Sequence, residues 1–164
     1  ISFDYKKFGI DDSDHTVLSP YLLKQYNSLW YVMGYNHEKK AVRTYALDRV
    51  VKMKGASSHE YNSTFLKEIS EQIKHCIGVS LIGKPPIEIG LEVKADQWLY
   101  LEASPFHSSQ KKLSQINDKV QFSLYVIDNY EFRQALFWHL GKVKVITPIA
   151  LVESIKKEEN LYYN

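Results

Sequence analysis

Apolar and polar residues alternate along the start of the chain in short runs that turn-forming residues interrupt. Residues 1–5 show the period of a strand with one buried face. Similar runs over residues 15–26 and 30–35, and one or two more within 41–54, predict further strands. Five short strands in so little chain predict a small, highly curved β-barrel.

The run at residues 30–35 carries apolar side chains on both faces, which predicts a central strand with Trp30 in the core. Asn27 and Ser28 separate it from the preceding strand as a turn. Pro20 lies inside that preceding strand and predicts an edge or a bulge, because proline cannot donate a hydrogen bond to the ladder.

The period changes after residue 61. Apolar residues recur at every fourth position from Phe65 to Ile73, which predicts a helix that Asn62 or Ser63 caps. The stretch 83–86 ends in two prolines and can continue neither helix nor sheet. We therefore expect two domains, and their predicted bounds are 1–84 and 85–164.

The second domain alternates strand and helix patterns. Strands are expected at 87–93, 111–116, 120–127 and 143–146, and helices at 95–103, 130–140 and 148–155. Asn129 is expected to cap the middle helix, whose Phe132, Leu136 and Leu140 share one face, and Thr147 to cap the last. The order β-α-β-β-α-β-α predicts a ferredoxin-like sandwich with an added helix, and the chain as a whole is α+β.

Composition limits the possible classes of protein. Hydrophobic residues make up 45% and charged residues 24% of 164 residues, as in globular proteins. A net charge of +2 is too small to indicate nucleic-acid binding, so any electrostatic site must be a local patch. Cys76 is the only cysteine, which fits a reducing compartment, and no apolar run suggests a membrane span or signal peptide. We expect a cytoplasmic protein. The chain opens without Met, within strand alternation, and we expect it to be a fragment of a longer protein.

Arg43 is the leading candidate for a ligand contact. Its guanidinium offers a rigid fork that matches a phosphate and also stacks on rings. Tyr45 shares its strand parity, so a phosphate contact and a stacking surface would lie side by side. The alternative is an exposed arginine whose stem packs over a neighbour.

Arg49 lies six residues from Arg43, roughly 20 Å along a straight strand, too far to share one phosphate. Three interpretations remain open: a sharp bend at Leu47–Asp48, an extended oligonucleotide ligand, or a structural arginine held by a carboxylate such as Asp48.

Three further residues are weaker candidates. Lys24 could supply a looser contact, or it could be a solvated strand lysine. Tyr31 could reach the site. His107, with Ser108 and Gln110, forms a polar cluster that could line a pocket between domains or simply a turn.

Catalysis is not expected. The six histidines lack metal-ligand spacing, no glycines of a nucleophile elbow surround Ser104 and His107, and no glycine-rich phosphate loop is present. We therefore expect neither an enzyme nor a metal or cofactor.

Three N-terminal motifs together resemble the WYL domain of bacterial transcriptional regulators. They are Leu18-Ser-Pro-Tyr21, Trp30-Tyr-Val32 and Arg43-Thr-Tyr-Ala-Leu-Asp-Arg-Val50, with Val32 in place of the leucine that completes the family's triplet. Residues 104–110, 130–141, 143–148 and 162–163 resemble the C-terminal extension of such regulators, and 77–79 resembles members from Bacteroidetes-type bacteria.

The resemblance implies an Sm-like or SH3-like barrel, preceded in the family by a winged helix-turn-helix that binds operator DNA. This chain would then be the sensing and dimerising region, with a nucleotide or single-stranded nucleic acid as its effector. Two alternatives remain: a stand-alone nucleic-acid-binding module and a scaffold that only holds dimers together.

A homodimer through the second domain is also expected from the residues. Phe137 and Trp138 fall off the face of the helix formed by Phe132 and Leu136, and one helix cannot bury all these rings in so small a sandwich.

Overall fold

The computed structural model describes residues 1–55, 58–139 and 141–162. Leu140, predicted on the apolar face of a helix, and Tyr163, one of the residues that carry the resemblance, lie outside the described residues. The chain forms two compact units. One comprises residues 1–74 and 78–81, and the other comprises 75–77 and 82–164.

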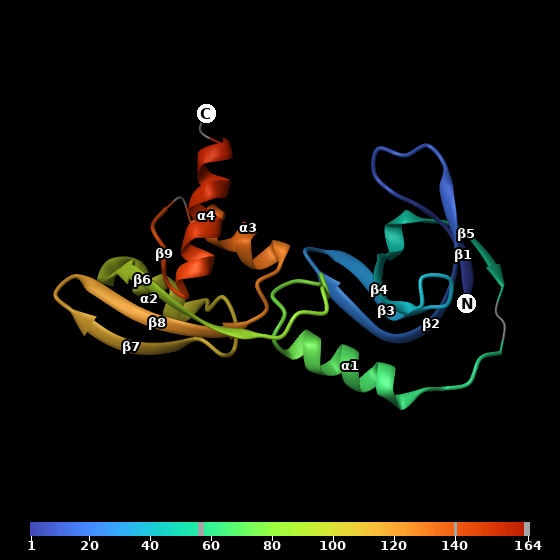
Figure 1. The fold of residues 1–164 in the computed structure, drawn as a ribbon, viewed down its shortest axis with the longest axis horizontal. Helices are drawn as coiled ribbons and strands as arrows, with labels where there is room; N and C mark the ends of the chain where they lie inside the picture. The colour runs from blue at the N-terminus through green and yellow to red at the C-terminus, as the bar shows by residue number, and fades with distance from the viewer. Residues whose placement is uncertain (56–57, 140, 163–164) are drawn as a thin grey trace. The chain divides into compact units, whose positions relative to one another are not determined.

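The N-terminal unit contains a five-stranded antiparallel sheet in the order β4-β3-β2-β1-β5 (Figure 1). The strands are β1 (Ser2–Lys6), β2 (Ser13–Tyr26), β3 (Leu29–Asn36), β4 (Ala41–Ala46) and β5 (Val50–Gly55). All strands expected from the alternation are present. Asn27 and Ser28 have positive φ, 47° and 64°, as a two-residue hairpin between Tyr26 and Leu29 requires.

The sheet is open rather than a closed barrel, which corrects the expected architecture. Within residues 1–55, β4 and β5 are the two edge strands and no ladder joins them. The 3₁₀ turn η1 (Leu47–Arg49) separates them, and β5 pairs with β1 instead. The bulge expected at Pro20 is present, because the β2–β3 register shifts between Pro20 and Leu22.

Each face of this sheet has its own apolar cluster. On the inner face, Phe3, Tyr5, Leu18, Val32 and Tyr45 pack together. On the outer face, Met33 packs with Ile69 and Val79.

Helix α1 (Ser63–Lys74) packs on part of the outer face through Ile69. The helix begins where the sequence predicted, and the Asn62 side chain accepts a hydrogen bond from the Thr64 amide at 2.9 Å.

Trp30 is 50% exposed, so the prediction that it is a core residue is wrong. It lies one residue after the start of β3, next to the Asn27–Ser28 turn, and Leu29 beside it is also exposed.

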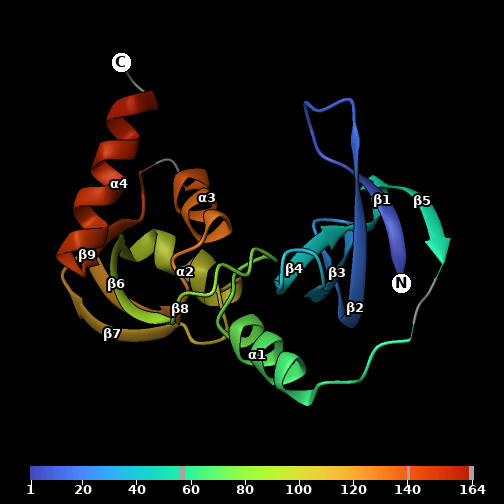
Figure 2. The same ribbon diagram turned by 45° about the vertical axis from the view of Figure 1, so that its right-hand side comes forward.

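The C-terminal unit has the predicted order of strands and helices (Figure 2). Its elements are β6 (Ile87–Lys94), α2 (Ala95–Ala103), β7 (Lys111–Ile116), β8 (Lys119–Val126), α3 (Tyr130–Trp138), β9 (Lys144–Thr147) and α4 (Ile149–Tyr162). The sheet order is β7-β8-β6-β9 with every pair antiparallel, as in a split βαβ arrangement. Helix α4 is longer than predicted. No helix in the described ranges is long and apolar enough to span a membrane.

Asn129 caps α3 as expected and also ties a distant segment to this unit. Its Oδ1 accepts a hydrogen bond from the Phe132 amide at 2.9 Å. Its Nδ2 donates to the Ile77 carbonyl at 2.8 Å and lies 3.1 Å from Cys76 Sγ. With Asn129 only 2% exposed, these contacts are shielded from water.

Candidate ligand-binding site

Tyr45 lies in the inner core of the N-terminal sheet. It is 4% exposed, and its ring centroid is 5.4 Å from that of Phe3 and 4.9 Å from that of Tyr5. Its hydroxyl accepts a hydrogen bond from Asn36 Nδ2 at 2.7 Å, and burial raises the pKa of the phenol. Other rings cover Tyr45, so the expected stacking of a base on this residue does not fit its placement.

Arg43 is exposed on the same face of β4 as Tyr45. In the β3–β4 ladder it lies opposite Gly34, which has no side chain to cover it. Its Nη1 donates to the neighbouring Val42 carbonyl at 2.9 Å. The positive charge of Arg43 lowers the pKa of the Tyr45 phenol, but burial, the largest influence, raises it.

Arg49 lies in η1, so the chain bends at Leu47–Asp48, as the first of the three interpretations requires. Its Cζ is 4.4 Å from the ring centroid of Phe8 and 5.6 Å from that of Tyr5, both within cation–π range. Its Nε is buried, and within the described part of the chain it has no hydrogen-bond partner. In the same residues Arg49 has no ion pair with Asp48, which was one of the three interpretations.

These residues form a series on one face of the sheet: Arg43 beside Tyr45, Tyr45 against Tyr5, and Tyr5 under Arg49. In the described ranges, neither arginine has a carboxylate partner. Two guanidinium groups without acid partners, one of them already stacked on a ring, are suited to an anionic ligand.

Phe8 was missed by sequence reasoning. It is 79% exposed and lies in the turn after β1, directly before Gly9. The sequence did contain a signal for Phe8: it is a large aromatic residue among charged residues in a turn, where a side chain is not expected to pack into a core. Phe8 takes the place of Tyr45 as the exposed ring beside an arginine.

Lys24 and Tyr31 lie on the outer face and are not brought near Arg43. They are opposite each other in the β2–β3 ladder. Lys24 Nζ donates to the Gly78 carbonyl at 2.7 Å, and Tyr31 packs at the margin of the outer-face cluster.

His107 belongs to the C-terminal unit. Its Nδ1 lies 2.8 Å from Ser109 Oγ, and that oxygen accepts a hydrogen bond from the Tyr125 amide at 2.9 Å. The cluster ties the loop after α2 to β8. Among the described residues, no group of three or more His, Cys, Asp or Glu side chains could hold a metal ion.

A second aromatic cluster, also missed from the sequence, lies on the outer face of the N-terminal unit. The rings of His37 and His59 stack with centroids 3.8 Å apart, and Ser19 Oγ lies 2.9 Å from His37 Nε2. Burial lowers the pKa of His37, and the neighbouring His59 lowers it further. His59 and Ser19 also line a cavity of about 210 Å³. The two histidines are 22 residues apart, so no local spacing could have indicated that they stack.

Comparisons with known proteins agree with the N-terminal motifs. Residues 1–54 match the family model of the WYL domain, and they include every predicted ligand residue except His107. Among solved structures, the chain is similar to proteasome accessory factor B/C (PafBC) of Arthrobacter aurescens, with 17% identity and a TM-score of 0.39. The alignment covers 94% of this chain and 23% of that one, so the chain spans about a quarter of that protein's length. The comparison with curated proteins found no match.

Proposed function

We propose that this chain, whose residues 1–54 form a WYL domain, is the effector-binding region of a transcriptional regulator. We propose further that its effector is a nucleotide or a short single-stranded nucleic acid. The observation that carries the proposal is Arg49, which stacks on the exposed Phe8 and keeps a buried Nε without a partner in the described part of the chain.

The chemistry of the site favours a ligand that has both a phosphate and a ring. The guanidinium fork of Arg49 can pair with phosphate oxygens, while Phe8 offers a face on which a base can stack. Arg43 supplies a second cation on the same face of the sheet for the next phosphate.

The proposed mechanism contains no catalytic step. The ligand favours one conformation of the regulator and so shifts the population that is competent to bind operator DNA through a helix-turn-helix outside these residues. The proposal includes a cytoplasmic location, which the presence of a single, buried cysteine, Cys76, supports.

Binding of a labelled single-stranded oligonucleotide, measured across a range of salt concentrations, tests the site. Arg49→Lys keeps the charge but removes the fork and the stacking, so we expect affinity to fall about tenfold. Arg43→Ala should reduce the slope of log affinity against log salt by about 0.7, the share of one phosphate contact on a single strand. Phe8→Leu should cost about 1–3 kcal/mol and leave the slope unchanged.

Lys67→Gln on the exposed surface of α1 is the matched control and should change neither affinity nor slope. If Arg49→Lys binds as the wild type does, the fork has no role. If no oligonucleotide or nucleotide binds at any salt concentration, the anionic-ligand proposal fails, and a scaffold that only holds dimers together becomes the better interpretation.

A specific observation also supports dimerisation through the C-terminal unit. On α3, Trp138 is 82% exposed and Tyr130 is exposed as well, while Phe137 packs partly against the core. We propose that these two exposed rings belong to an apolar patch that a second copy of the chain covers.

Sedimentation velocity should therefore show a homodimer at tens of micromolar protein, roughly the range for an interface of standard size. Trp138→Lys should shift the protein to monomer, whereas Glu102→Lys, at an exposed polar position of α2, should leave the dimer intact. A wild-type monomer at these concentrations would contradict the proposed association.

A further inference from the structure

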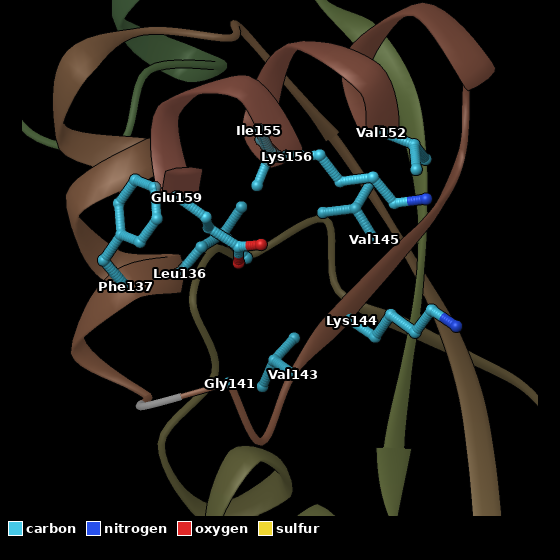
Figure 3. A pocket seen from close by; sticks show the side chains of 10 residues that line it. All are labelled: Leu136, Phe137, Gly141, Val143, Lys144, Val145, Val152, Ile155, Lys156 and Glu159. Atoms are coloured by element: carbon cyan, nitrogen blue, oxygen red, sulfur yellow. The ribbon is translucent and has the colours of Figure 1, made fainter. Parts of the chain in front are cut away.

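The C-terminal unit contains a cavity that plays no part in the function proposed above. It has a volume of about 270 Å³ and lies between α3, β9 and α4 (Figure 3). Its apolar walls come from all three elements, with Leu136 from α3, Val145 from β9 and Ile155 from α4, and also from Val143, directly before β9.

The cavity also carries charge of both signs. The carboxylate of Glu159 is directed into it, while the side chains of Lys144 and Lys156 extend to one side (Figure 3). Within the described ranges, neither Glu159 nor Lys156 forms an ion pair or a hydrogen bond. A half-buried carboxylate against apolar walls is costly unless a donor meets it, so its most favourable partner is a bound group with N–H donors.

We propose that this cavity binds a small zwitterion with an apolar side chain, of the size and chemistry of leucine. The ligand's ammonium group pairs with Glu159, its carboxylate with Lys156 and Lys144, and its aliphatic side chain lies against Val143, Val145 and Leu136.

The volume permits a ligand of this size, and the charges select its class. One water needs about 10–15 Å³ of such volume, so a cavity of about 270 Å³ has room for the nine non-hydrogen atoms of leucine. A simple organic cation would meet two lysines, and a simple carboxylate would meet Glu159, so each would gain one favourable contact and one repulsive one. Only a zwitterion satisfies both signs while its side chain remains in the apolar part.

Calorimetry with the whole chain and three matched ligands tests the assignment. Leucine is compared with isocaproate, which lacks the ammonium group, and with isoamylamine, which lacks the carboxylate. We expect leucine to bind about tenfold or more tightly than either analogue, the effect of one charge-assisted hydrogen bond. In methyl-detected NMR, leucine should shift the signals of Val143, Val145 and Val152 in a saturable way.

Two variants separate the charges. Glu159→Gln should weaken leucine about tenfold but not isocaproate, and Lys156→Gln should weaken leucine but not isoamylamine. Glu153→Gln and Lys157→Gln, exposed on the same helix and outside the cavity, are the controls and should change nothing. NMR spectra with dispersed methyl signals confirm that each variant is folded.

Three results would overturn the proposal. They are the absence of methyl shifts at saturating leucine, equal binding of all three ligands, and leucine binding that neither variant weakens. Because this cavity lies in the C-terminal unit, the oligonucleotide measurements with Arg43 and Arg49 variants neither support nor contradict it.

Discussion

Replacing Gly34 with alanine is expected to destabilise the N-terminal unit by at least about 3 kcal/mol, near the upper end of overpacking effects. A Cβ at this position would lie 2.3 Å from the Ser19 carbonyl oxygen and 2.9 Å from Leu18 Cγ. The carbonyl is backbone in the neighbouring strand β2, where Ser19 is opposite Tyr35 in the ladder. The clash can therefore be relieved only by separating β2 from β3. Native-state hydrogen exchange, read on the amides of β3, measures the loss for this unit alone.

Gly9→Ala is the matched control for this substitution. Gly9 has a φ of +72°, but nothing lies within 4 Å of a Cβ built there. Its replacement should cost only the penalty of a left-handed backbone, about 1 kcal/mol. If Gly34→Ala costs no more than Gly9→Ala, the close approach of β2 to β3 does not require glycine.

Asn129→Ala is expected to lower the free energy of unfolding of the C-terminal unit by about 3 kcal/mol. Loss of the N-cap accounts for about 1 kcal/mol. The remainder comes from the Ile77 carbonyl, which loses the hydrogen bond donated by Asn129 Nδ2 in a site closed to water. Hydrogen exchange of the α3 and β8 amides checks the value.

Two further variants divide this effect into its parts. Asn129→Ser can still cap α3 but lacks the amide that donates to the Ile77 carbonyl. Its free energy of unfolding should therefore exceed that of Asn129→Ala only by the contribution of the cap, about 1 kcal/mol. Asn62→Ala removes the exposed cap of α1 and should cost about 1 kcal/mol or less. If Asn129→Ala and Asn62→Ala have equal effects, the buried contacts of Asn129 with Ile77 and Cys76 contribute nothing.

Local patterns were sufficient to place most of the helices and strands. The expected bounds of α2 (Ala95–Ala103) and β7 (Lys111–Ile116) are those in the structure, and Asn129 caps α3 as its side chain predicts. Periodicity, turn residues and caps act between residues close in the chain, so the sequence contains all the information they need. The element order of the C-terminal unit follows from them.

Local sequence patterns predicted the candidate site only in part. Strand parity placed Arg43 and Tyr45 on one face correctly, but parity does not say which part of a face is covered. Phe3 and Tyr5, some forty residues earlier, cover Tyr45 and leave Arg43 in water.

By itself, then, the sequence determined the strands, the helices, their caps and the WYL motifs, because each depends on neighbouring residues. Only the tertiary structure decided that the sheet is open, that Trp30 is exposed, and that Lys24 and Tyr31 lie on the opposite face from Arg43. It also placed Phe8 against Arg49 and left Arg49 Nε without a partner in the described ranges. These outcomes depend on pairing and burial between distant segments, and no local period in the sequence records them.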